Sequence, residues 1–388
     1  MPGPEFCPRP RRIRRGAALT FVFVTVLATG AATNALPHVQ EPAAHPLAAR
    51  PTGPAAATAD RDAVARAAAE AAADGKSGKE AAEEVVSRSG DRWGAVYDKR
   101  EYDDLRQDLD GEYTGVGLSA ARSGNGRVEV TRVRPGGPAD RAGVEAGDRL
   151  RAIDGRPVDR RPVTEVVALL RGNERTSVAL GLERAGRSWT ETLTRATLST
   201  ESVTVRRIDD HAVMIKVAAF TKGSGARVRE AVREAPEGAG VLLDLRGNAG
   251  GLVKEAVAAA AAFLDGGLVA TYDVRGTQHA LYADPGGDTD RPVVALVDSG
   301  TMSAAELVTG ALQDRGRAVT VGSRTFGKGS VQMPSELPDG SVAELTVGHY
   351  RTPAGHDVDG EGITPDLAVP ERAEERAQKV LGGLGAGS

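Results

Sequence analysis

The second half of the chain alternates short apolar runs with longer segments whose apolar positions recur every three to four residues. The runs predict buried strands, and they cover 212–220, 240–246, 292–298 and 318–323. The longer segments predict helices, and they cover 225–235, 253–267 and 303–316. Apolar strands that alternate with helices are typical of a mostly parallel sheet with both faces covered. Residues 199–370 are therefore expected to form an α/β domain.

Residues 113–198 differ, because polar and apolar positions alternate there with a period of two. That pattern occurs at 126–133 and 177–184 and predicts strands. Two short helical stretches, 138–143 and 163–172, lie between them. Strands and two helices in under 90 residues indicate a compact α+β module.

Residues 60–112 predict a helical arm, since their Ala-rich stretches carry charged pairs at i and i+4. Gly90 is expected to end the second helix of this arm. An apolar stripe is expected to follow, consisting of Trp93, Tyr97, Tyr102 and Leu105. At the other end of the chain, the tail at 371–388 is expected to be helical and then rich in Gly.

The first 35 residues predict a targeting segment. Five arginines between Arg9 and Arg15 precede an uncharged run at 16–33, and small residues surround Ala35. A signal peptide has this order of charge, apolar run and small residues. The run is also long enough for a short membrane anchor, so cleavage and anchoring both stay open. Either outcome places the rest of the chain outside the cytoplasm, beyond a disordered linker rich in Pro and Ala at 36–59.

Charge and cysteine content exclude several kinds of partner and site. The net charge of the chain is −4, and residues 1–35 contribute +4 through five Arg and one Glu. The exported part therefore carries about −8, which argues against a nucleic-acid partner. The only cysteine, Cys7, lies before the apolar run. The exported part thus has no disulfide, no Cys-based metal site and no cysteine nucleophile.

Ser303 follows a predicted strand and opens a predicted helix. Unpaired backbone N–H groups at a helix N-terminus can hold a developing oxyanion, so this position suits a nucleophile. Ser303 and Glu306 also match a capping box, in which the serine only caps the helix. Taken by itself, this segment favours the cap.

Lys328 lies between two glycines, 25 residues after Ser303. No histidine occupies a strand-to-loop position that pairs with Ser303, so a lysine of lowered pKa is the candidate base. Gln332 follows four residues later, and on a strand it would share a face with Lys328 and could orient its amine. The alternative is a surface lysine in a glycine turn, which is the commoner arrangement for such a segment in isolation.

Other chemistry is disfavoured. Residues 322–329 nearly match a phosphate-binding loop, but Gly329 replaces the required hydroxyl residue and no helix is expected to follow. Asp314 is expected to form a structural ion pair. The carboxylates at 356–362 lack the full calcium-loop pattern, so no metal is assigned.

The segment 242–256 brings a buried strand to Arg246, then Asn248 and the pair Gly250 and Gly251, and then a helix. Open α/β sheets place sites at the carboxyl ends of their strands, and glycines let backbone N–H groups approach a ligand. A tight connecting loop is the alternative interpretation.

Three segments of the α/β domain together resemble the core motifs of the C-terminal processing peptidases, also called tail-specific proteases. They are DLRGNAGG, SGTMSAAELVTGALQD and TFGKGSVQ. The PDZ domain of that family resembles the upstream segments GEYTGVGLSAA, VRPGGPADRAGVEAGDRLRAIDGRPV and VVALLRG. GHDVDGEGITPDLAV resembles the segment that closes the protease core. The resemblance covers about 90–370, and Met302 departs from it, because the family more often has a small residue there.

The resemblance implies a ClpP/crotonase-like α/β serine protease core at 199–370 and a PDZ-like domain at 113–198. Ser303 would be the nucleophile, Lys328 the general base and Gln332 the residue that orients the base. No cofactor is implied.

The resemblance also implies binding residues. The oxyanion would be held by the backbone N–H of Ala304 and by that of either Gly250 or Gly251. The PDZ-like domain would capture the C-terminal carboxylate of a protein substrate and would add the bound peptide as a strand. The residues implied for this capture are Gly115, Val116, Gly117 and Leu118, with Arg171 as a sensor of the carboxylate.

The leading hypothesis is an exported serine endopeptidase with a Ser-Lys dyad, which recognises free C-terminal tails and cleaves through an acyl-enzyme. A catalytically silent tail-binding protein is the second hypothesis, and a nucleotide-binding protein is the third. Membrane association through 16–33, a homodimer through the arm at 60–110, and gating by domain motion are further expectations.

Overall fold

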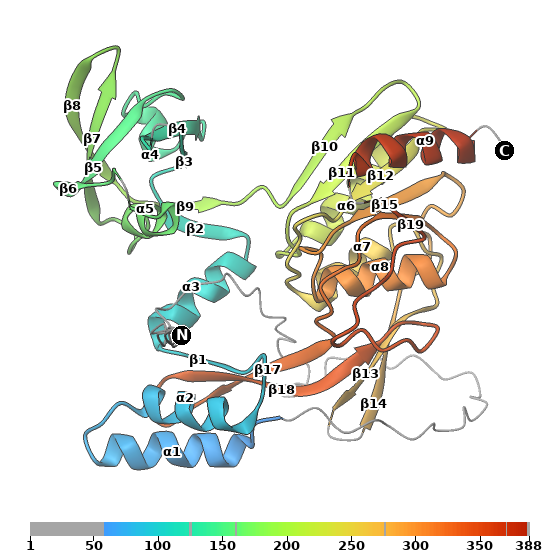
Figure 1. Ribbon diagram of the computed structural model, residues 1–388, viewed down its shortest axis with the longest axis horizontal. Coiled ribbons are helices and arrows are strands. Elements are labelled where there is room, and N and C mark those ends of the chain that lie inside the picture. The colour runs from blue at the N-terminus through green and yellow to red at the C-terminus, as the bar shows by residue number, and fades with distance from the viewer. Residues whose placement is uncertain (1–57, 124–125, 160, 275–276, 370, 386–388) are drawn as a thin grey trace, which may run out of the picture.

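The computed structural model describes residues 58–123, 126–159, 161–274, 277–369 and 371–385. Figure 1 shows an α/β core, a smaller module that stands apart from it, and a helical arm at the lower left, below the module. The predicted targeting segment and all but the last two residues of the linker lie outside the described residues. Within the described residues, no helix is both long enough and apolar enough to cross a membrane.

The core is built on a six-stranded sheet, which confirms the predicted mostly parallel arrangement. Its first strand runs antiparallel to the second, and the other pairs are parallel. In spatial order the strands are β10 (Val203–Arg207), β11 (Ala212–Val217), β12 (Gly240–Asp244), β15 (Val293–Val297), β16 (Val319–Gly322) and β19 (Leu367–Ala368).

Helices cover both faces of this sheet, as predicted from its apolar strands. One face packs against three helices, α6 (Ser224–Glu234), α7 (Val253–Ala260) and α8 (Ala304–Asp314). The opposite face packs against α9 (Ala373–Gly385), whose Ala377 and Leu381 contact Leu242 and Leu296 in a separate apolar cluster. The helix of the tail therefore belongs to the core.

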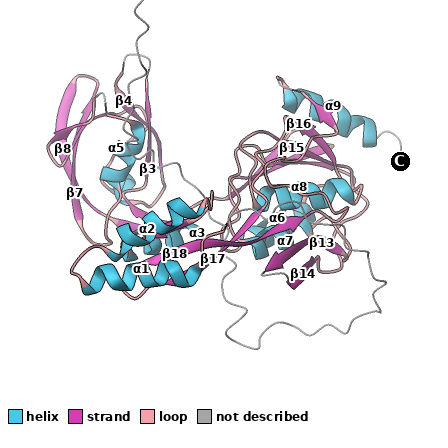
Figure 2. Cartoon of the chain, turned by 60° about the horizontal axis from the view of Figure 1, so that its bottom comes forward, coloured by secondary structure: helices cyan, strands magenta, loops and turns pink. Residues whose placement is uncertain are grey.

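A second sheet, which the sequence patterns do not predict, joins the core to the arm (Figure 2). Its pairs are antiparallel, and its longest strand, β18, has Glu344 opposite Ala95 of the arm. The strands are β1 (Ala95–Tyr97), β13 (Leu268–Val274), β14 (Thr277–Tyr282), β17 (Ser330–Glu336) and β18 (Val342–Arg351).

The arm contains α1 (Arg61–Ala73), α2 (Gly78–Ser89) and α3 (Lys99–Leu109). Gly90 ends α2 in a left-handed conformation, as predicted. The expected helical stripe is wrong in its first half, because Tyr97 lies in strand β1 and Trp93 precedes that strand. Asp98 and Glu101 form a capping box, so α3 begins only at Lys99. The residues before Asp98, Ala95–Tyr97, pair with the edge of β18 instead.

The small module has its own apolar core around Leu150, Leu180 and Leu182. Its helices are α4 (Pro138–Arg141) and α5 (Val163–Leu170), which agree with the two predicted stretches. Its strands are β2 (Glu112–Gly115), β3 (Leu118–Arg122), β4 (Val128–Val133), β5 (Arg149–Ile153), β6 (Arg156–Pro157), β7 (Ser177–Arg184), β8 (Arg187–Thr194) and β9 (Ala196–Ser199). The β2–β9 pair forms the connection to the arm and core in Figure 1.

Candidate active site

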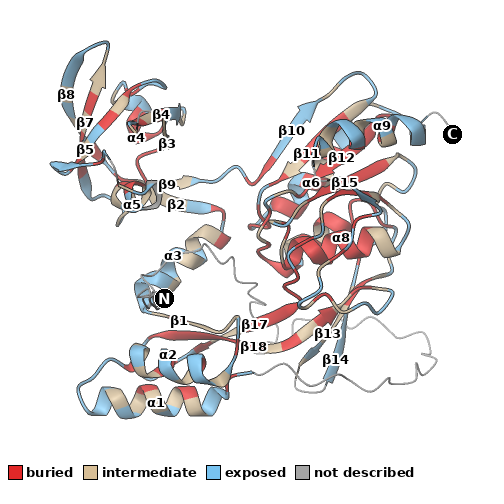
Figure 3. Cartoon of the chain, in the orientation of Figure 1, coloured by how far each residue is buried: buried red, intermediate tan, exposed pale blue. Residues whose placement is uncertain are grey.

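Ser303 lies at the turn from β15 into α8, and its backbone is strained. Its φ of 54° and ψ of −119° are unusual for a residue with a side chain, and only 1% of its surface is exposed. Gly250 approaches this turn closely, since a Cβ placed there would lie 3.0 Å from Ser303 Cβ and 3.2 Å from the Ala304 nitrogen. Figure 3 shows that α8 is buried along most of its length, so the turn is held rigidly.

Glu306 forms the bond expected of the predicted capping box, but it also binds groups outside the helix. Its buried carboxylate accepts the Ser303 backbone N–H at 2.9 Å, as a capping box requires. It also accepts the Thr325 hydroxyl at 2.5 Å and the backbone N–H groups of Gly327 and Lys328 at 2.7 and 2.9 Å. One carboxylate thus ties the turn of the candidate nucleophile to the loop of the candidate base.

The same contacts exclude the phosphate-binding interpretation of 322–329. The N–H groups of Gly327 and Lys328 point at Glu306, and strand β17 follows them where a phosphate loop needs a helix. The nucleotide hypothesis is therefore wrong for this loop.

Lys328 is fully buried, which contradicts the surface-lysine alternative. None of its surface is exposed, and its ammonium nitrogen lies 4.9 Å from the centre of the Trp93 ring. Burial lowers the pKa of Lys328 to about 8, although several carboxylates nearby oppose that shift. A lysine in this state can act as a base near neutral pH.

Gln332 is also buried, but it forms no hydrogen bond with the amine of Lys328. Its amide nitrogen donates to Ser330 Oγ at 2.8 Å and to Thr346 Oγ1 at 3.3 Å. Lys328 Nζ has no hydrogen-bond partner in the described part of the chain, and neither does Gln332 Oε1. Lys328 precedes β17, and the register shifts between Val331 and Gln332, so regular strand alternation does not relate the two side chains.

Tyr350 was not predicted from the sequence, yet it joins the two candidate catalytic segments. Its hydroxyl donates to the backbone carbonyl of Ser303 at 2.8 Å and to that of Lys328 at 3.1 Å. Complete burial raises the pKa of Tyr350 well above its usual value, so the hydroxyl keeps its proton and these bonds. No local sequence pattern marks this residue.

Backbone donors gather beside Ser303. Ala304 is the first residue of α8, where N–H groups have no partner within the helix. The Gly250 N–H donates to Asn248 Oδ1 at 2.9 Å, and Asn248 is held in turn by its bond to the Val217 carbonyl. Gly251 has a φ of 129°, and a Cβ there would collide with the Phe220 carbonyl, so only glycine fits.

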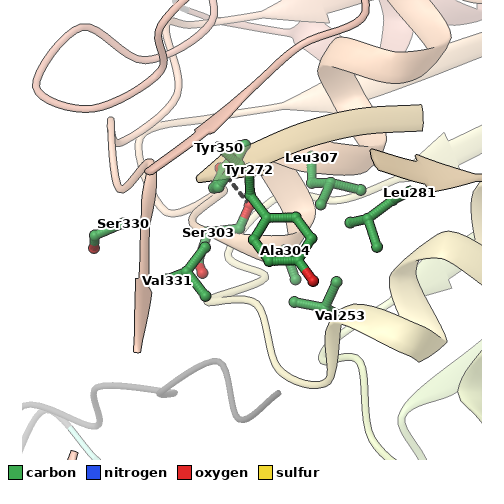
Figure 4. Close-up of a pocket in the computed structure, with 9 residues that line it drawn as sticks. All are labelled: Val253, Tyr272, Leu281, Ser303, Ala304, Leu307, Ser330, Val331 and Tyr350. Carbon is green, nitrogen blue, oxygen red and sulfur yellow. Dashed lines mark hydrogen bonds between the residues drawn. The ribbon is translucent and has the colours of Figure 1, made fainter. Parts of the chain in front are cut away.

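An apolar pocket opens beside Ser303. Figure 4 shows the side chains of Val253, Leu281 and Leu307 around the Tyr272 ring, with Ser303 next to them. The full lining is Val253, Tyr272, Leu281, Ser303, Ala304, Leu307, Ser330, Val331 and Tyr350. The free space within it is only about 10 Å³, about the size of one water molecule, so a substrate side chain would enter it only if the lining moved apart.

The residues implied for tail capture lie in the small module, away from Ser303 (Figure 1). Gly115 ends β2, Leu118 begins β3, and Val116 and Gly117 connect the two strands. Arg171, just after α5, is 3.3 Å from Asp108 of α3, and its guanidinium lies 5.7 Å from the centre of the Tyr113 ring. Arg171 therefore bridges the module to the arm.

The remaining acidic candidates serve the structure. Asp314, at the far end of α8 from Ser303, accepts the Ala354 N–H and lies 3.6 Å from His356 Nδ1. Across the described ranges, no group of three or more His, Cys, Asp or Glu side chains is arranged to hold a metal ion.

Known proteins match both the core and the small module. The profile of peptidase family S41 matches residues 211–369, and that of a PDZ domain matches residues 129–184. A carboxyl-terminal-processing protease of Synechocystis sp. is 35% identical over 301 residues, which make up 75% of this chain and 70% of that protein.

One further relative and one solved structure are similar to this chain. The chloroplastic carboxyl-terminal-processing peptidase 2 of Arabidopsis thaliana is 33% identical over 311 residues, or 75% of this chain and 60% of that longer protein. The solved structure of a photosystem II D1 C-terminal processing protease is 30% identical, with a TM-score of 0.51 over 79% of this chain and 86% of that one.

Proposed function

Because the chain belongs to peptidase family S41, with the carboxyl-terminal-processing proteases, we propose that it cleaves proteins with a Ser303–Lys328 dyad and recognises their free C-terminal tails. The observation that carries the dyad is the burial of Lys328, which lowers its pKa to about 8, on a loop that Glu306 ties to the turn of the strained Ser303. The presence of both groups in a buried site favours this function over that of a catalytically silent tail-binding protein.

The chemistry follows from the groups around Ser303. The neutral amine of Lys328 takes the proton of Ser303 Oγ as that oxygen attacks the carbonyl carbon of the scissile bond. The resulting oxyanion accepts hydrogen bonds from the Ala304 N–H and, we infer, from the Gly251 N–H, because the Gly250 N–H is engaged by Asn248. The Lys328 ammonium then protonates the leaving amine, and water hydrolyses the acyl-enzyme.

We infer that Lys328 is in the arrangement of a resting enzyme, because its nitrogen lies 4.9 Å from the centre of the Trp93 ring and forms no hydrogen bond within the described residues. A bound substrate that favours the form with the dyad assembled would shift the population toward it. In that form Gln332 Oε1, which is also without a partner among the described residues, can orient the amine.

The rate of cleavage is expected to depend on pH through Lys328. The residue acts as a base only when neutral, and burial lowers its pKa from the ordinary value of 10.5 to about 8. The value of kcat/KM should therefore rise with pH, with a midpoint near 8, when peptide cleavage is measured between about pH 6 and pH 10. A midpoint near that of an exposed lysine would contradict the role assigned to burial.

Tail recognition would use the loop from Gly115 to Leu118, whose backbone N–H groups can capture a carboxylate. A carboxylate near Arg171 would compete with Asp108 of the arm, which supports a role for Arg171 as a sensor of such capture. The substrate class is thus a protein with a free C-terminal tail. The apolar lining of the small pocket beside Ser303 favours an apolar residue next to the scissile bond.

The decisive experiment incubates the chain from residue 36 onward with an unstructured protein that ends in a free apolar tail. Cleavage is compared with that of the same protein amidated at its C-terminus, and Ser303→Ala serves as the inactive control. Amidation is expected to slow cleavage roughly tenfold, the effect of losing charge-assisted hydrogen bonds. Equal cleavage of both substrates would overturn tail recognition, and cleavage by Ser303→Ala would overturn the dyad.

The role of Arg171 has a matched test. Arg171→Ala is expected to reduce the preference for the free tail over the amidated one, because the group that senses the carboxylate is lost. Arg187→Ala removes an exposed arginine from β8 of the same module and should leave that preference unchanged. The measurement is the ratio of the two cleavage rates for each variant. If Arg171→Ala and Arg187→Ala give the same ratio of rates, Arg171 does not sense the carboxylate and its role is limited to the contact with Asp108.

Export of the protein rests on residues 1–35, and we propose an extracytoplasmic location with the apolar run at 16–33 as signal or anchor. A homodimer through the arm stays a prediction.

A further inference from the structure

Glu344 is a buried acid that the proposed mechanism does not use. It lies on β18 opposite Pro334 of β17 and Ala95 of β1, and none of its surface is exposed. Neither of its carboxyl oxygens has a hydrogen-bond partner within the described residues. Burying an acid without a partner is costly, so a compensating group is expected close by.

Lys328 is the complementary group. It is the other buried ionisable side chain whose charged atom has no hydrogen-bond partner in the described part of the chain. Burial raises the pKa of Glu344, and the nearby Lys328 opposes that shift. In the other direction, Glu344 is the strongest of the charges that raise the pKa of Lys328 against its burial.

Three other carboxylates act on Lys328, but all three are already engaged. Asp91 accepts from the backbone of Trp93 and Gly94 and from Thr346. The Glu306 carboxylate has four donors, as described above. Asp359 accepts the Gly329 N–H and lies 3.7 Å from His349 Nε2.

The groups that face Glu344 itself include two tyrosines. Tyr97 of β1 and Tyr102 of α3 both have a raised pKa, caused first by burial and then by Glu344. Both tyrosines are therefore neutral in the working pH range. Lys328 is the one cation among the described residues that is coupled to Glu344.

We propose that Glu344 is a positioning residue that acts as the counter-ion of Lys328, pairing with the ammonium that forms when Ser303 gives up its proton. This proposal rests on the proposed function. The proton moves from Ser303 Oγ to Lys328 Nζ, and the Glu344 carboxylate gains none but stabilises the new positive charge. The aspartate of a serine-protease triad supports its histidine in the same way.

Glu344→Gln tests the proposal through the pH profile of the full chain. Without the carboxylate the lysine loses its proton more readily, so the acid limb of kcat/KM moves to lower pH. The ratio of kcat/KM near pH 6.5 to that near pH 9.5 should rise by roughly threefold to tenfold. A fall of about half a unit to one unit in the pH midpoint of the acid limb produces a change of this size. Glu336→Gln is the control, because Glu336 is an exposed acid on β17, and its profile should match the parent. An unmoved acid limb in Glu344→Gln would overturn the proposal.

A second measurement needs neither proteolysis nor a folded Glu344→Gln variant. The chain contains eight lysines, so 13C-lysine NMR of Ser303→Ala can follow Lys328 alone, assigned by its loss in Lys328→Met. Coupled groups show both titration steps in each signal. The Lys328 signal should therefore respond to the titration of 13C-labelled Glu344. A single independent step would refute the pairing even if the protein proves to be an active protease. A coupled titration in a protein without activity would instead leave the pairing standing and count against the proposed function.

Discussion

Replacing Ser303 by alanine is expected to lower kcat/KM by on the order of 10⁴-fold or more, because the attacking oxygen is removed. The fold should survive, since the carboxylate of Glu306 and the hydroxyl of Tyr350 bind the backbone of Ser303 and not its side chain. The measurement is steady-state cleavage of a peptide together with the thermal unfolding midpoint.

The matching change at the base separates catalysis from stability. Lys328→Met removes the amine but keeps an apolar stem of similar length, so cleavage should fall by a comparable factor. The double variant should lose no more than either single one, because groups that act as a unit are not additive. A further loss in the double variant would show that the two residues act independently.

Lys328→Met is also expected to stabilise the protein. The pKa of Lys328 is lowered to about 8 in the folded state, so folding disfavours its proton. The resulting cost is absent above the unfolded pKa of 10.5, grows as the pH falls, and is complete below about 8. The variant should therefore gain up to about 3 kcal/mol in its free energy of unfolding at pH 7 and nothing at high pH. Equal stability of parent and variant at pH 7 would contradict the burial of the charge.

Replacing Glu306 by alanine is expected to damage activity and stability together. The change leaves the backbone N–H groups of Ser303, Gly327 and Lys328 and the hydroxyl of Thr325 without their buried acceptor. The loss should reach on the order of 4 kcal/mol in the free energy of unfolding, as for other broken buried networks. Cleavage should fall even at temperatures where the variant is folded, because the turn and the loop are no longer tied together.

Denaturant unfolding and peptide cleavage measure the two effects of Glu306→Ala. Glu336→Ala is the control, since that exposed acid at the end of β17 should change both quantities little. If the Glu306→Ala variant cleaves as fast as the parent at temperatures where it is folded, Glu306 acts only as a helix cap.

The sequence was informative where the structure depends on local patterns. The strands of the core sheet were predictable because strands buried on both faces are continuous apolar runs, as in β12 and β15. Gly90 marked a helix end because glycine readily adopts the left-handed conformation found there. The second sheet was missed, since its strand β1 spans only Ala95–Tyr97 and forms by pairing with a segment about 250 residues away.

The sequence by itself determined which residues are candidates, because Ser303 and Lys328 lie in motifs that together resemble those of one peptidase family, although each segment alone favours a helix cap or a surface lysine. Only the tertiary structure decided what state those residues are in. Lys328 is buried because Trp93 of the distant arm covers it, and Glu344 and Tyr350 reach the site from β18. Burial, and with it the pKa of a buried group, depends on contacts between remote segments, which no local pattern of residues encodes.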